Sequence, residues 1–481
     1  MESSQKKDEI GLTVSKDKDF SEWYTQVVQK AELADYSPVK GCMVIRPHAY
    51  AVWEKIQEYF NERLKKLHVD NAYFPLFIPE SFFKKEMQHA EGFTPEVAWI
   101  ANKEEGGERL AVRPTSETIM YDSYSKWIRS HRDLPLRINQ WSNCVRWETK
   151  QTRLFLRTRE FLWQEGHCVY ETEKECEKET LLILEEYQRL CREVLAIEVI
   201  MGRKSENERF AGAKETYSID AIMPDGRALQ MGTSHHLGQG FAKAFDISFL
   251  GKDGQEHTPW QNSWGVSTRL LGAMVMVHGD DKGIILPPHA AAHPVVIVPI
   301  YREEEKDNVI KAARDLEKTL GALRPILDDR DGYTPGWKFN QWELKGIPVR
   351  IELGPKDLAK KHAVLVRRDT GKKIDVPLTD IKKAVTDLLE DIHASLLKHS
   401  QQILTSHVVA VSTWKELSHA LDSKKVARGS WCGKAACEEK VKDQLNGAKS
   451  INIPLVQSGK LGKCIICSEQ AQYFALFGKV Y

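Results

Sequence analysis

Apolar residues recur at helical spacing in two segments near the start of the chain, 21–34 and 49–68. In the second segment, Val52, Ile56 and Leu64 fall on one face of a helix with about 3.6 residues per turn. Six shorter apolar or alternating runs then predict strands at 110–113, 136–147, 155–170, 216–223, 227–231 and 263–268. Few helical patterns separate these runs, so we expect an antiparallel sheet flanked by helices, an α+β arrangement.

The pattern changes near Pro287, Pro288 and Pro294. Beyond them, strands are predicted at 295–300, 325–328, 348–353 and 363–368, with helices at 303–323, 336–345 and 379–403. This alternation predicts a small α/β domain with some parallel pairing. We therefore expect a polar tail at 1–20, a first domain at 21–287, a second at 288–403 and a short third at 404–481.

Composition changes this picture little. The 481 residues fit about three domains, and 69 basic against 68 acidic residues give a net charge of +1, which does not indicate a nucleic-acid partner. The first twenty residues are charged and polar, so a secretory signal is excluded and we expect a cytoplasmic protein. Apolar runs are far shorter than the roughly 20 residues of a spanning helix, so no membrane segment is expected. Five of the nine cysteines are scattered, as in a reducing compartment.

Glycine-rich nucleotide loops are missing from the sequence. The segment starting at Gly429 is one residue short of a P-loop and has Ala435 where a hydroxyl is needed. The pair Gly238 and Gly240 lacks the third glycine of a dinucleotide fingerprint, since Lys243 stands there. An ATP-binding protein with this sequence would need another device.

The segment 143–167 offers such a device. Arg146 and Glu148 lie two apart on one predicted strand, and Phe161, Trp163 and Glu165 alternate on the next, so each set shares a face. The connecting hairpin carries the basic residues Lys150, Arg153, Arg157 and Arg159. Arginine forks bind phosphate and carboxylate oxygens and can orient a triphosphate without a P-loop. The alternative is a solvated, salt-bridged hairpin.

Two further segments favour a nucleotide site. Residues 112–118 precede an amphipathic helix, where a plain helix start capped by Thr115, with Glu117 in its first turn, is the alternative. Residues 264–270 end a strand and open a helix with Arg269. The three segments together are harder to explain by helix caps and surface charge alone.

These segments resemble the signature motifs of class II aminoacyl-tRNA synthetases. Residues 74–77 are similar to the first motif through Pro75, the segment from Arg146 to 157–161 to the second, and the stretch around Arg269 to the third. Within that class, RPTSET (113–118), REFLWQEGH (159–167), QMGTSH (230–235) and the loop 89–96 resemble prolyl-tRNA synthetases of the archaeal and eukaryotic type. The resemblance extends over about 23–481 and implies an antiparallel-sheet catalytic core, an α/β anticodon-binding domain and a small α/β zinc-binding C-terminal domain.

The resemblance implies ATP-dependent attachment of L-proline to tRNA(Pro) through a prolyl-adenylate, with Arg146 and Arg269 as catalytic residues. Proline is a secondary ammonium with a ring, so its pocket needs acceptors and flat apolar walls. The implied proline-binding residues are Thr115, Glu117, Arg146, Phe161, Trp163 and His235. The implied ATP-binding residues are Arg146, Glu148, Arg157, Thr158, Gln230, Thr233 and Arg269, with Gln230 also on Mg²⁺.

Other readings of the first domain remain open. A threonine enzyme of the same subclass would use a catalytic zinc held by cysteine and histidines, which Glu117 and Trp163 argue against. A non-catalytic tRNA-binding paralogue would usually lack the motif arginines. His235 and His236 could be read as metal ligands, but no cysteine or third histidine has matching local spacing, so we expect one pocket residue and one structural residue.

The two later domains carry separate chemistry. Residues 289–403 resemble the anticodon-binding domain of class IIa synthetases, and Glu352 and Lys356 are the candidates for contacting anticodon bases, with a solvated loop as the alternative. Cys432 and Cys437, then Cys464 and Cys467, have the spacing of a four-thiolate structural zinc site, with independent buried thiols as the alternative.

The family also suggests features of the whole molecule. The motif around Pro75 belongs to the dimer interface in this class, which implies a homodimer. The C-terminal segment 474–481 resembles relatives in which the last tyrosine packs toward the active site. Only about a hundred residues separate Glu165 from Trp264, so the large editing domain of bacterial-type enzymes is not expected.

Overall fold

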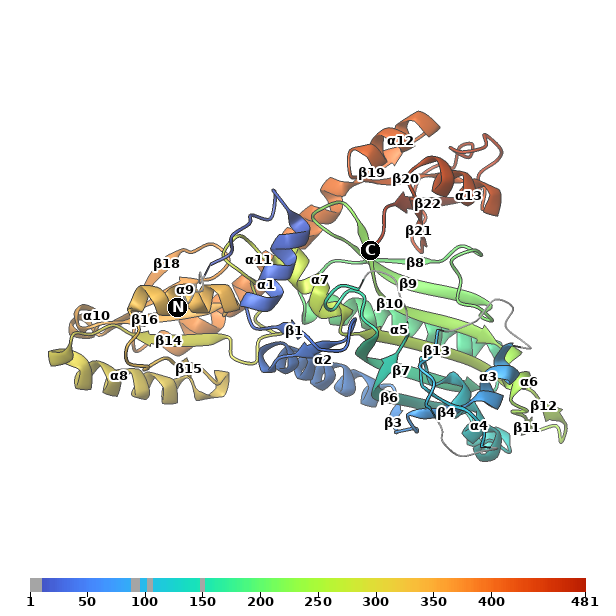
Figure 1. The fold of residues 1–481 in the computed structure, drawn as a ribbon, viewed down its shortest axis with the longest axis horizontal. Coiled ribbons are helices and arrows are strands. Elements are labelled where there is room, and N and C mark those ends of the chain that lie inside the picture. Colours follow the sequence, from blue (N-terminus) through green and yellow to red (C-terminus); the bar gives the residue numbers. More distant parts are fainter. Residues whose placement is uncertain (1–10, 88–95, 102–106, 148–151) are drawn as a thin grey trace, which may run out of the picture.

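The computed structural model describes residues 11–87, 96–101, 107–147 and 152–481. Three lobes are visible in Figure 1: a large sheet with its helices, a smaller lobe at the left, and a C-terminal lobe at the upper right. Helix α11 (Ile381–His407) links the left lobe to the C-terminal lobe. None of the helices in the described residues is long and apolar enough to cross a membrane.

An eleven-stranded sheet runs through the large lobe and into the C-terminal lobe. In spatial order its strands are β19 (Val408–Val411), β20 (Val426–Trp431), β22 (Tyr473–Gly478), β21 (Lys449–Pro454), β8 (Ile200–Arg203), β9 (Glu215–Ile222), β10 (Ala228–Gly238), β13 (Trp260–Ser267), β7 (Glu160–Tyr170), β6 (Leu136–Val145) and β3 (Asp70–Asn71). From β20 to β6 all neighbours are antiparallel, as the strand pattern predicted.

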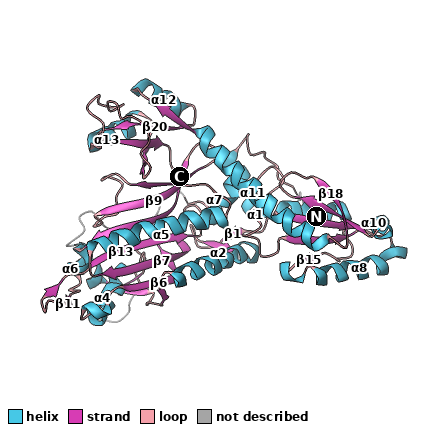
Figure 2. Ribbon diagram, turned by 180° about the vertical axis from the view of Figure 1, so that it is seen from behind, coloured by secondary structure: helices cyan, strands magenta, loops and turns pink. Residues whose placement is uncertain are grey.

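Helices α2 (Pro47–Lys66) and α5 (Glu173–Glu193) cover one face of this sheet, and Figure 2 shows them side by side across the strands. The sheet residues on this face include Gln164, which bonds to Tyr187 of α5. Gly166 also belongs to it, because an added Cβ would meet the Trp264 ring at 2.2 Å. Burial of this face against the two helices leaves the alternate residues of each strand to face the other side.

The remaining elements of the large lobe are short and frame the sheet. They are α1 (Phe20–Lys30), β1 (Ala34–Tyr36), β2 (Met43–Ile45), β4 (Phe77–Pro79), α3 (Glu80–Met87), β5 (Leu110–Val112), α4 (Glu117–Trp127), α6 (Gly240–Ala244), β11 (Phe249–Leu250), β12 (Glu256–His257) and α7 (Arg269–His278). Residues 11–19, in the expected polar tail, contact this lobe: Lys16 Nζ donates to Gly279 O at 2.6 Å.

The left lobe holds a five-stranded sheet. Its strands, in spatial order, are β15 (Ile326–Leu327), β14 (Val295–Pro299), β16 (Val349–Leu353), β17 (His362–Arg367) and β18 (Lys373–Pro377). The first three are parallel and the last two antiparallel, so the expected parallel pairing is confirmed. Its helices are α8 (Lys306–Thr319), α9 (Pro335–Lys345) and α10 (Pro355–Lys360). Helices α8 and α11 fill one face of the sheet, and α9 packs on the other.

The C-terminal lobe adds α12 (Trp414–Asp422) and α13 (Ala435–Gln444) to strands β19–β22. Its strands are continuous with those of the large lobe, because β21 pairs with β8 at Ile453 and Arg203. Asn452 also donates to a buried carboxylate of the large lobe, Asp220 Oδ2, at 2.8 Å. The lobe is therefore joined to the strands beside the site described below.

Some predicted element bounds were wrong. The strand expected at 155–170 begins at Glu160, because Leu154, Phe155 and Leu156 form a turn whose apolar side chains are buried under α1 and α7 rather than in the sheet. The helix expected at 21–34 ends at Lys30, since Ala34 starts the β1–β2 pair. Helix α11 continues to His407, past the expected end at 403.

Candidate active site

A cavity of about 1790 Å³ opens on the face of the sheet that α2 and α5 leave uncovered. Eleven of the predicted site residues line it: Thr115, Glu117, Arg146, Arg157, Thr158, Phe161, Trp163, Gln230, Thr233, His235 and Arg269. Glu148 and the loop 89–95 lie outside the described residues. Residues more than a hundred positions apart thus meet in one cavity.

Strand register brings the floor of this cavity together. One cross-strand row joins Glu165 on β7, Gly265 on β13 and Thr233 on β10. The next row joins His167, Ser263 and His235 on the same three strands. Because side chains alternate along a strand, these residues all point to the cavity side. Glycine suits position 265 because the space there is tight: an added Cβ would lie 3.1 Å from Gln164 O and 3.6 Å from the Trp163 ring.

Thr115 and Glu117 form an anionic notch in the wall. Both are buried, at 6% and 4% exposure, and the Thr115 hydroxyl donates to one carboxylate oxygen of Glu117. The cap of helix α4 is Ser116, not Thr115, so the plain N-cap interpretation of Thr115 was wrong. The Thr115 hydroxyl instead lies beside the Glu117 carboxylate, and the oxygens of both groups can accept hydrogen bonds from a cation.

A buried ion pair supports this notch from below. Glu165 Oε2 lies 3.0 Å from His167 Nε2, and Glu165 also accepts from the Ser116 backbone at 3.0 Å and from Gln140 Nε2 at 3.1 Å. Although burial favours the neutral imidazole, the charge of Glu117 and the bond to Glu165 raise the pKa of His167. Burial opposes ionisation of Glu165 too, but its bond to His167 and further side-chain bonds lower its pKa. Both shifts favour the charged forms of the pair.

Glu117, Glu165 and His167 also lie within the mutual distance of metal ligands. Glu165 already bonds to His167, Ser116 and Gln140, however, and the raised pKa of His167 favours the imidazolium, which cannot ligate a metal. We interpret this cluster as a structural hydrogen-bond network.

Arg146 and two aromatic rings make the opposite wall. The Arg146 guanidinium lies 5.5 Å from the Phe161 ring and 5.7 Å from the Trp163 ring, and its Nε donates to Pro114 O at 3.3 Å. The two rings meet edge to face at 5.8 Å. A cation held over flat apolar surfaces can bind an anion without losing its orientation.

His235 borders the same cavity from β10. Its Nδ1 is 3.0 Å from Thr216 Oγ1, and its ring packs on Phe210 at 4.7 Å. Burial, followed by the charges of His167 and Arg146, lowers the pKa of His235 to about 3, so the ring is neutral. His236 points to the other face, where Nδ1 accepts from Gly238 N at 3.0 Å. The expectation of one pocket histidine and one structural histidine agrees with this geometry.

Cations gather at the other end of the cavity. Arg269, at the start of α7, donates from Nε to Leu156 O at 3.1 Å and from Nη1 to Gln230 O at 3.4 Å. Arg153 and Arg157 come from the turn before β7. Tyr481 reaches this end too, and its hydroxyl donates to Asp225 Oδ2 at 2.7 Å. The chain end therefore lies beside the basic residues.

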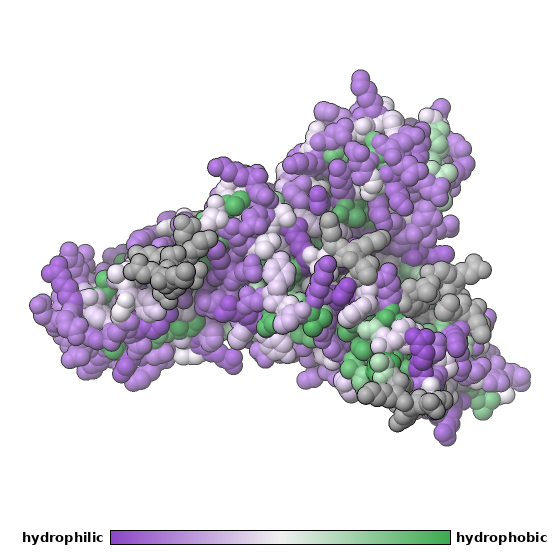
Figure 3. All heavy atoms as spheres, in the orientation of Figure 1, coloured by the Kyte–Doolittle hydropathy of each residue, from purple (hydrophilic) through white to green (hydrophobic). Residues whose placement is uncertain are grey.

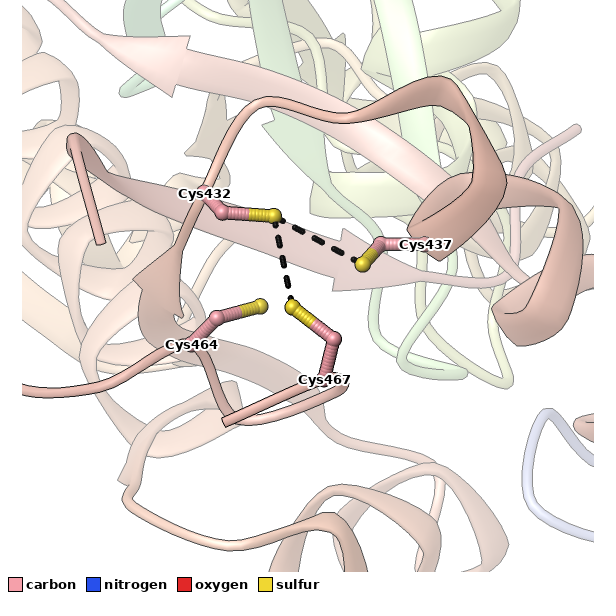
Figure 4. A group of neighbouring side chains, drawn as sticks. All are labelled: Cys432, Cys437, Cys464 and Cys467. Atoms are coloured by element: carbon pink, nitrogen blue, oxygen red, sulfur yellow. Dashed lines mark hydrogen bonds between the residues drawn. The ribbon is translucent and has the colours of Figure 1, made fainter. Parts of the chain in front are cut away.

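The cysteine cluster lies in the C-terminal lobe, apart from this cavity. Figure 4 shows the four sulfurs converging, and the Cys432 sulfur lies 3.6 Å from those of both Cys437 and Cys467. A tetrahedron with Zn–S bonds of about 2.3 Å has sulfurs about 3.8 Å apart. Burial raises the pKa of Cys432 and of Cys437, whereas backbone hydrogen bonds lower the pKa of Cys464 despite its burial. The arrangement therefore matches a four-thiolate metal site in both ligand type and spacing.

The two residues predicted to contact the anticodon are unlike each other. Lys356 is exposed on α10. Glu352 is buried on β16, where Oε1 accepts from Arg350 at 3.0 Å and Oε2 lies 2.7 Å from Lys373 Nζ. A buried, paired carboxylate is held in one position by its neighbours.

Sequence reasoning missed the residues that support the notch, chiefly His167, Gln140 and Ser116. Period-two alternation from Trp163 and Glu165 would have placed His167 on the cavity face. No comparable signal marks Gln140, because its contact with Glu165 depends on the pairing of β6 with β7.

Comparison with known proteins assigns the chain part by part. Residues 98–278 match the tRNA synthetase class II core domain (G, H, P, S and T), residues 294–388 the anticodon binding domain, and residues 414–481 the C-terminal domain of prolyl-tRNA synthetase.

Similar proteins extend over nearly the full chain. The chain is 50% identical to a proline–tRNA ligase of Natranaerobius thermophilus over 93% of both chains. It is 48% identical to that of Clostridium novyi, over 99% of this chain and 100% of the relative. It is 46% identical to proline–tRNA ligase 2 of Bacillus cereus, with the same coverage. With this similarity and the class II site geometry, the chain belongs to the prolyl-tRNA synthetase family.

Proposed function

We propose that this enzyme attaches L-proline to tRNA(Pro), with ATP as the energy source and prolyl-adenylate as the intermediate. The observation that carries the substrate choice is the buried Thr115–Glu117 notch facing the Phe161–Trp163 wall. A secondary ammonium needs two acceptors, and its ring needs flat apolar contact. Membership of the family supports the same activity.

Arg146 would bind the proline carboxylate and the α-phosphate together. Its guanidinium is positioned between the aromatic wall and Pro114, next to the notch. Five donors in one plane suit two oxyanions at once. His235 would close the proline site as a neutral ring, so it adds no competing cation beside the ammonium.

The basic end of the cavity would take the nucleotide. Arg157, Thr158, Gln230, Thr233 and Arg269 line this part of the cavity, and we assign them to ATP. Glu148 is assigned the same role on the motif resemblance. Mg²⁺, which we expect near Gln230, would offset phosphate charge when bound.

The reaction would proceed in two steps. A proline carboxylate oxygen attacks the α-phosphorus while the bond to pyrophosphate breaks. A ribose hydroxyl of the tRNA 3′ adenosine then attacks the prolyl carbonyl, and AMP leaves. Since a carboxylate is already a nucleophile, Arg146 and Arg269 would act by orienting the oxyanions and offsetting their charge.

The anticodon would be read by the left lobe, through Glu352 and Lys356. Glu352 is held in place by Arg350 and Lys373, and Lys356 is exposed nearby on α10. A carboxylate can accept from the N–H donors of a guanine edge, and an ammonium can donate to its acceptors.

We assign structural zinc to Cys432, Cys437, Cys464 and Cys467, because four sulfurs at tetrahedral spacing leave no position for a substrate.

A homodimer is also proposed, since the exposed aromatic residues Tyr73, Phe77 and Trp127 lie on the first-motif segment and near it. Figure 3 shows a mainly hydrophilic surface around the hydrophobic side chains that gather beside the catalytic sheet. The five cysteines outside the four-cysteine cluster form no disulfide, which supports a reducing, cytoplasmic location.

The test is ATP–pyrophosphate exchange with each amino acid supplied singly. We expect exchange with proline, and tRNA(Pro) charging by the same preparation. Exchange that depends on threonine would overturn the substrate assignment. A folded protein without amino-acid-dependent exchange would instead favour a non-catalytic tRNA-binding role.

A further inference from the structure

Two stacked aromatic rings lie on the left lobe without a role in the chemistry above. Tyr333 and Trp337 have ring centroids 4.0 Å apart and planes inclined by 24°. Tyr333 is 47% exposed and Trp337 is half-buried. We call these two residues the aromatic pair. A large exposed ring on one side of a stack offers a flat apolar surface to another molecule.

An arginine anchored on a buried carboxylate lies against this pair. The Arg330 guanidinium lies 5.2 Å from the Tyr333 ring and 5.4 Å from the Trp337 ring. Arg330 is bidentate to buried Asp328, with Nε and Nη2 at 2.8 and 2.7 Å. Trp342 Nε1 donates to the same carboxylate at 2.8 Å. The rings are therefore preorganised, which reduces the entropy lost on binding.

Topology places the pair at the edge where the anticodon contacts are expected. Strands β15, β14 and β16 are parallel, so their carboxyl ends meet at one edge of the sheet. Asp328 follows β15, and α10 with Lys356 follows β16. Figure 1 shows this lobe at the left, with α9, which carries Trp337, lying across the strands.

The carboxylates beside the aromatic pair are each offset by a base, so they do not repel a polyanion. The acidic residues of the loop are paired, Asp331 with Lys306 at 3.0 Å and Asp329 with Arg314 at 3.5 Å. The Arg330 guanidinium, itself paired with Asp328, lies against both rings, and Lys356 is exposed on α10, which follows β16 at the same edge of the sheet. Single-stranded RNA loops are bound by aromatic side chains and arginine planes, on which splayed-out bases stack.

We propose that the aromatic pair is a stacking platform for one unpaired base of the tRNA anticodon loop, with Arg330 beside its phosphate or ring. This inference rests on the proposed function. The partner is an RNA base because the pair lies within the segment that matches an anticodon binding domain. Stacking tolerates any base, so the platform supplies affinity, while Glu352 and Lys356 would supply base identity.

The test compares Tyr333→Ala and Trp337→Ala with Tyr333→Phe, which keeps the ring. Both alanine variants should lower kcat/KM for tRNA(Pro) charging about 5- to 150-fold, the range for one lost base–aromatic stack. Tyr333→Phe should stay near wild type. Trp414→Ala, which removes a half-buried ring under Lys440 in the C-terminal lobe, is the matched control and should leave charging unchanged.

Two further measurements separate a binding role from a structural one. Proline-dependent pyrophosphate exchange should be unchanged in every variant, because the catalytic cavity is untouched. The logarithm of kcat/KM for charging should fall with the logarithm of salt concentration at the same slope in Tyr333→Ala as in wild type, since no phosphate contact is lost. A tRNA carrying 2-aminopurine in turn at each unpaired anticodon-loop position should be quenched at one position by wild type and Tyr333→Phe, but not by Tyr333→Ala.

Charging within twofold of wild type by folded Tyr333→Ala, with the same quenching, would overturn the platform and leave the surface to a protein partner. Tyr333→Ala decides the outcome if Trp337→Ala fails to fold, because the Tyr333 ring is largely exposed. Wild-type enzyme without proline-dependent exchange would instead refute the proposed function itself.

Discussion

Replacing Glu117 by glutamine tests the amino-acid site most directly. The side chain is 4% exposed, and one of its oxygens already accepts from Thr115. The carbonyl oxygen of the new amide would keep that bond, so its NH₂ group would face the cavity. An N–H donor would then oppose the proline ammonium where an anionic acceptor had been, while the shape of the pocket would stay the same.

The magnitude follows from the hydrogen bond lost. A hydrogen bond to a charged group contributes about 1.5–3 kcal/mol, which corresponds to roughly a 10- to 150-fold change in affinity. The ammonium does not react, so its contact should be equal in the ground and transition states. We therefore expect KM for proline to rise by that factor with kcat nearly unchanged.

Proline-dependent ATP–pyrophosphate exchange measures both constants. Glu177→Gln, an exposed change of the same kind on α5, is the matched control and should leave KM at the wild-type value. A thermal melt checks that the variant is folded, because Glu117 also raises the pKa of the buried His167. A folded Glu117→Gln enzyme with KM within threefold of wild type would refute the assignment of the notch to the ammonium.

Four other outcomes are expected. Arg146→Ala should remove adenylate formation but keep the fold; near-normal pyrophosphate exchange would contradict its role. Alanine at both Glu352 and Lys356 should weaken charging far more than adenylate formation, and equal loss in the two assays would count against an anticodon contact. Chelation of zinc, or Cys467→Ser, should lower the melting temperature of the C-terminal lobe, whereas an unchanged melt in metal-free protein would refute the site. The pKa of His167 is raised in the folded protein, so its contribution to the free energy of unfolding is complete below about pH 6.5. That contribution is lost as the pH rises through the pKa of His167 in the folded state. The difference in unfolding free energy between wild type and His167→Gln should shrink over that rise; a constant difference would show that the imidazole is neutral.

The sequence alone predicted most of the chemically distinctive residues that line the cavity. The motif residues from Thr115 to Arg269 were identified through the resemblance to class II synthetases. The four-cysteine spacing and the α/β alternation after Pro294 follow from residue type and local periodicity, which are sequence properties. The sequence predicted the bounds of elements less well. Leu154, Phe155 and Leu156 looked like the start of a strand, but their burial under α1 and α7 makes them a turn.

The tertiary structure decided which of these residues meet. The rows that join Glu165 to Gly265 and Thr233 depend on strand register, and the Glu165–His167–Gln140 network depends on the pairing of β6 with β7. The anchoring of Arg330 by Asp328 beneath the aromatic pair is another contact of this kind. Periodicity fixes the face on which a side chain lies, but the partner across that face is set only when distant segments pair in the folded protein.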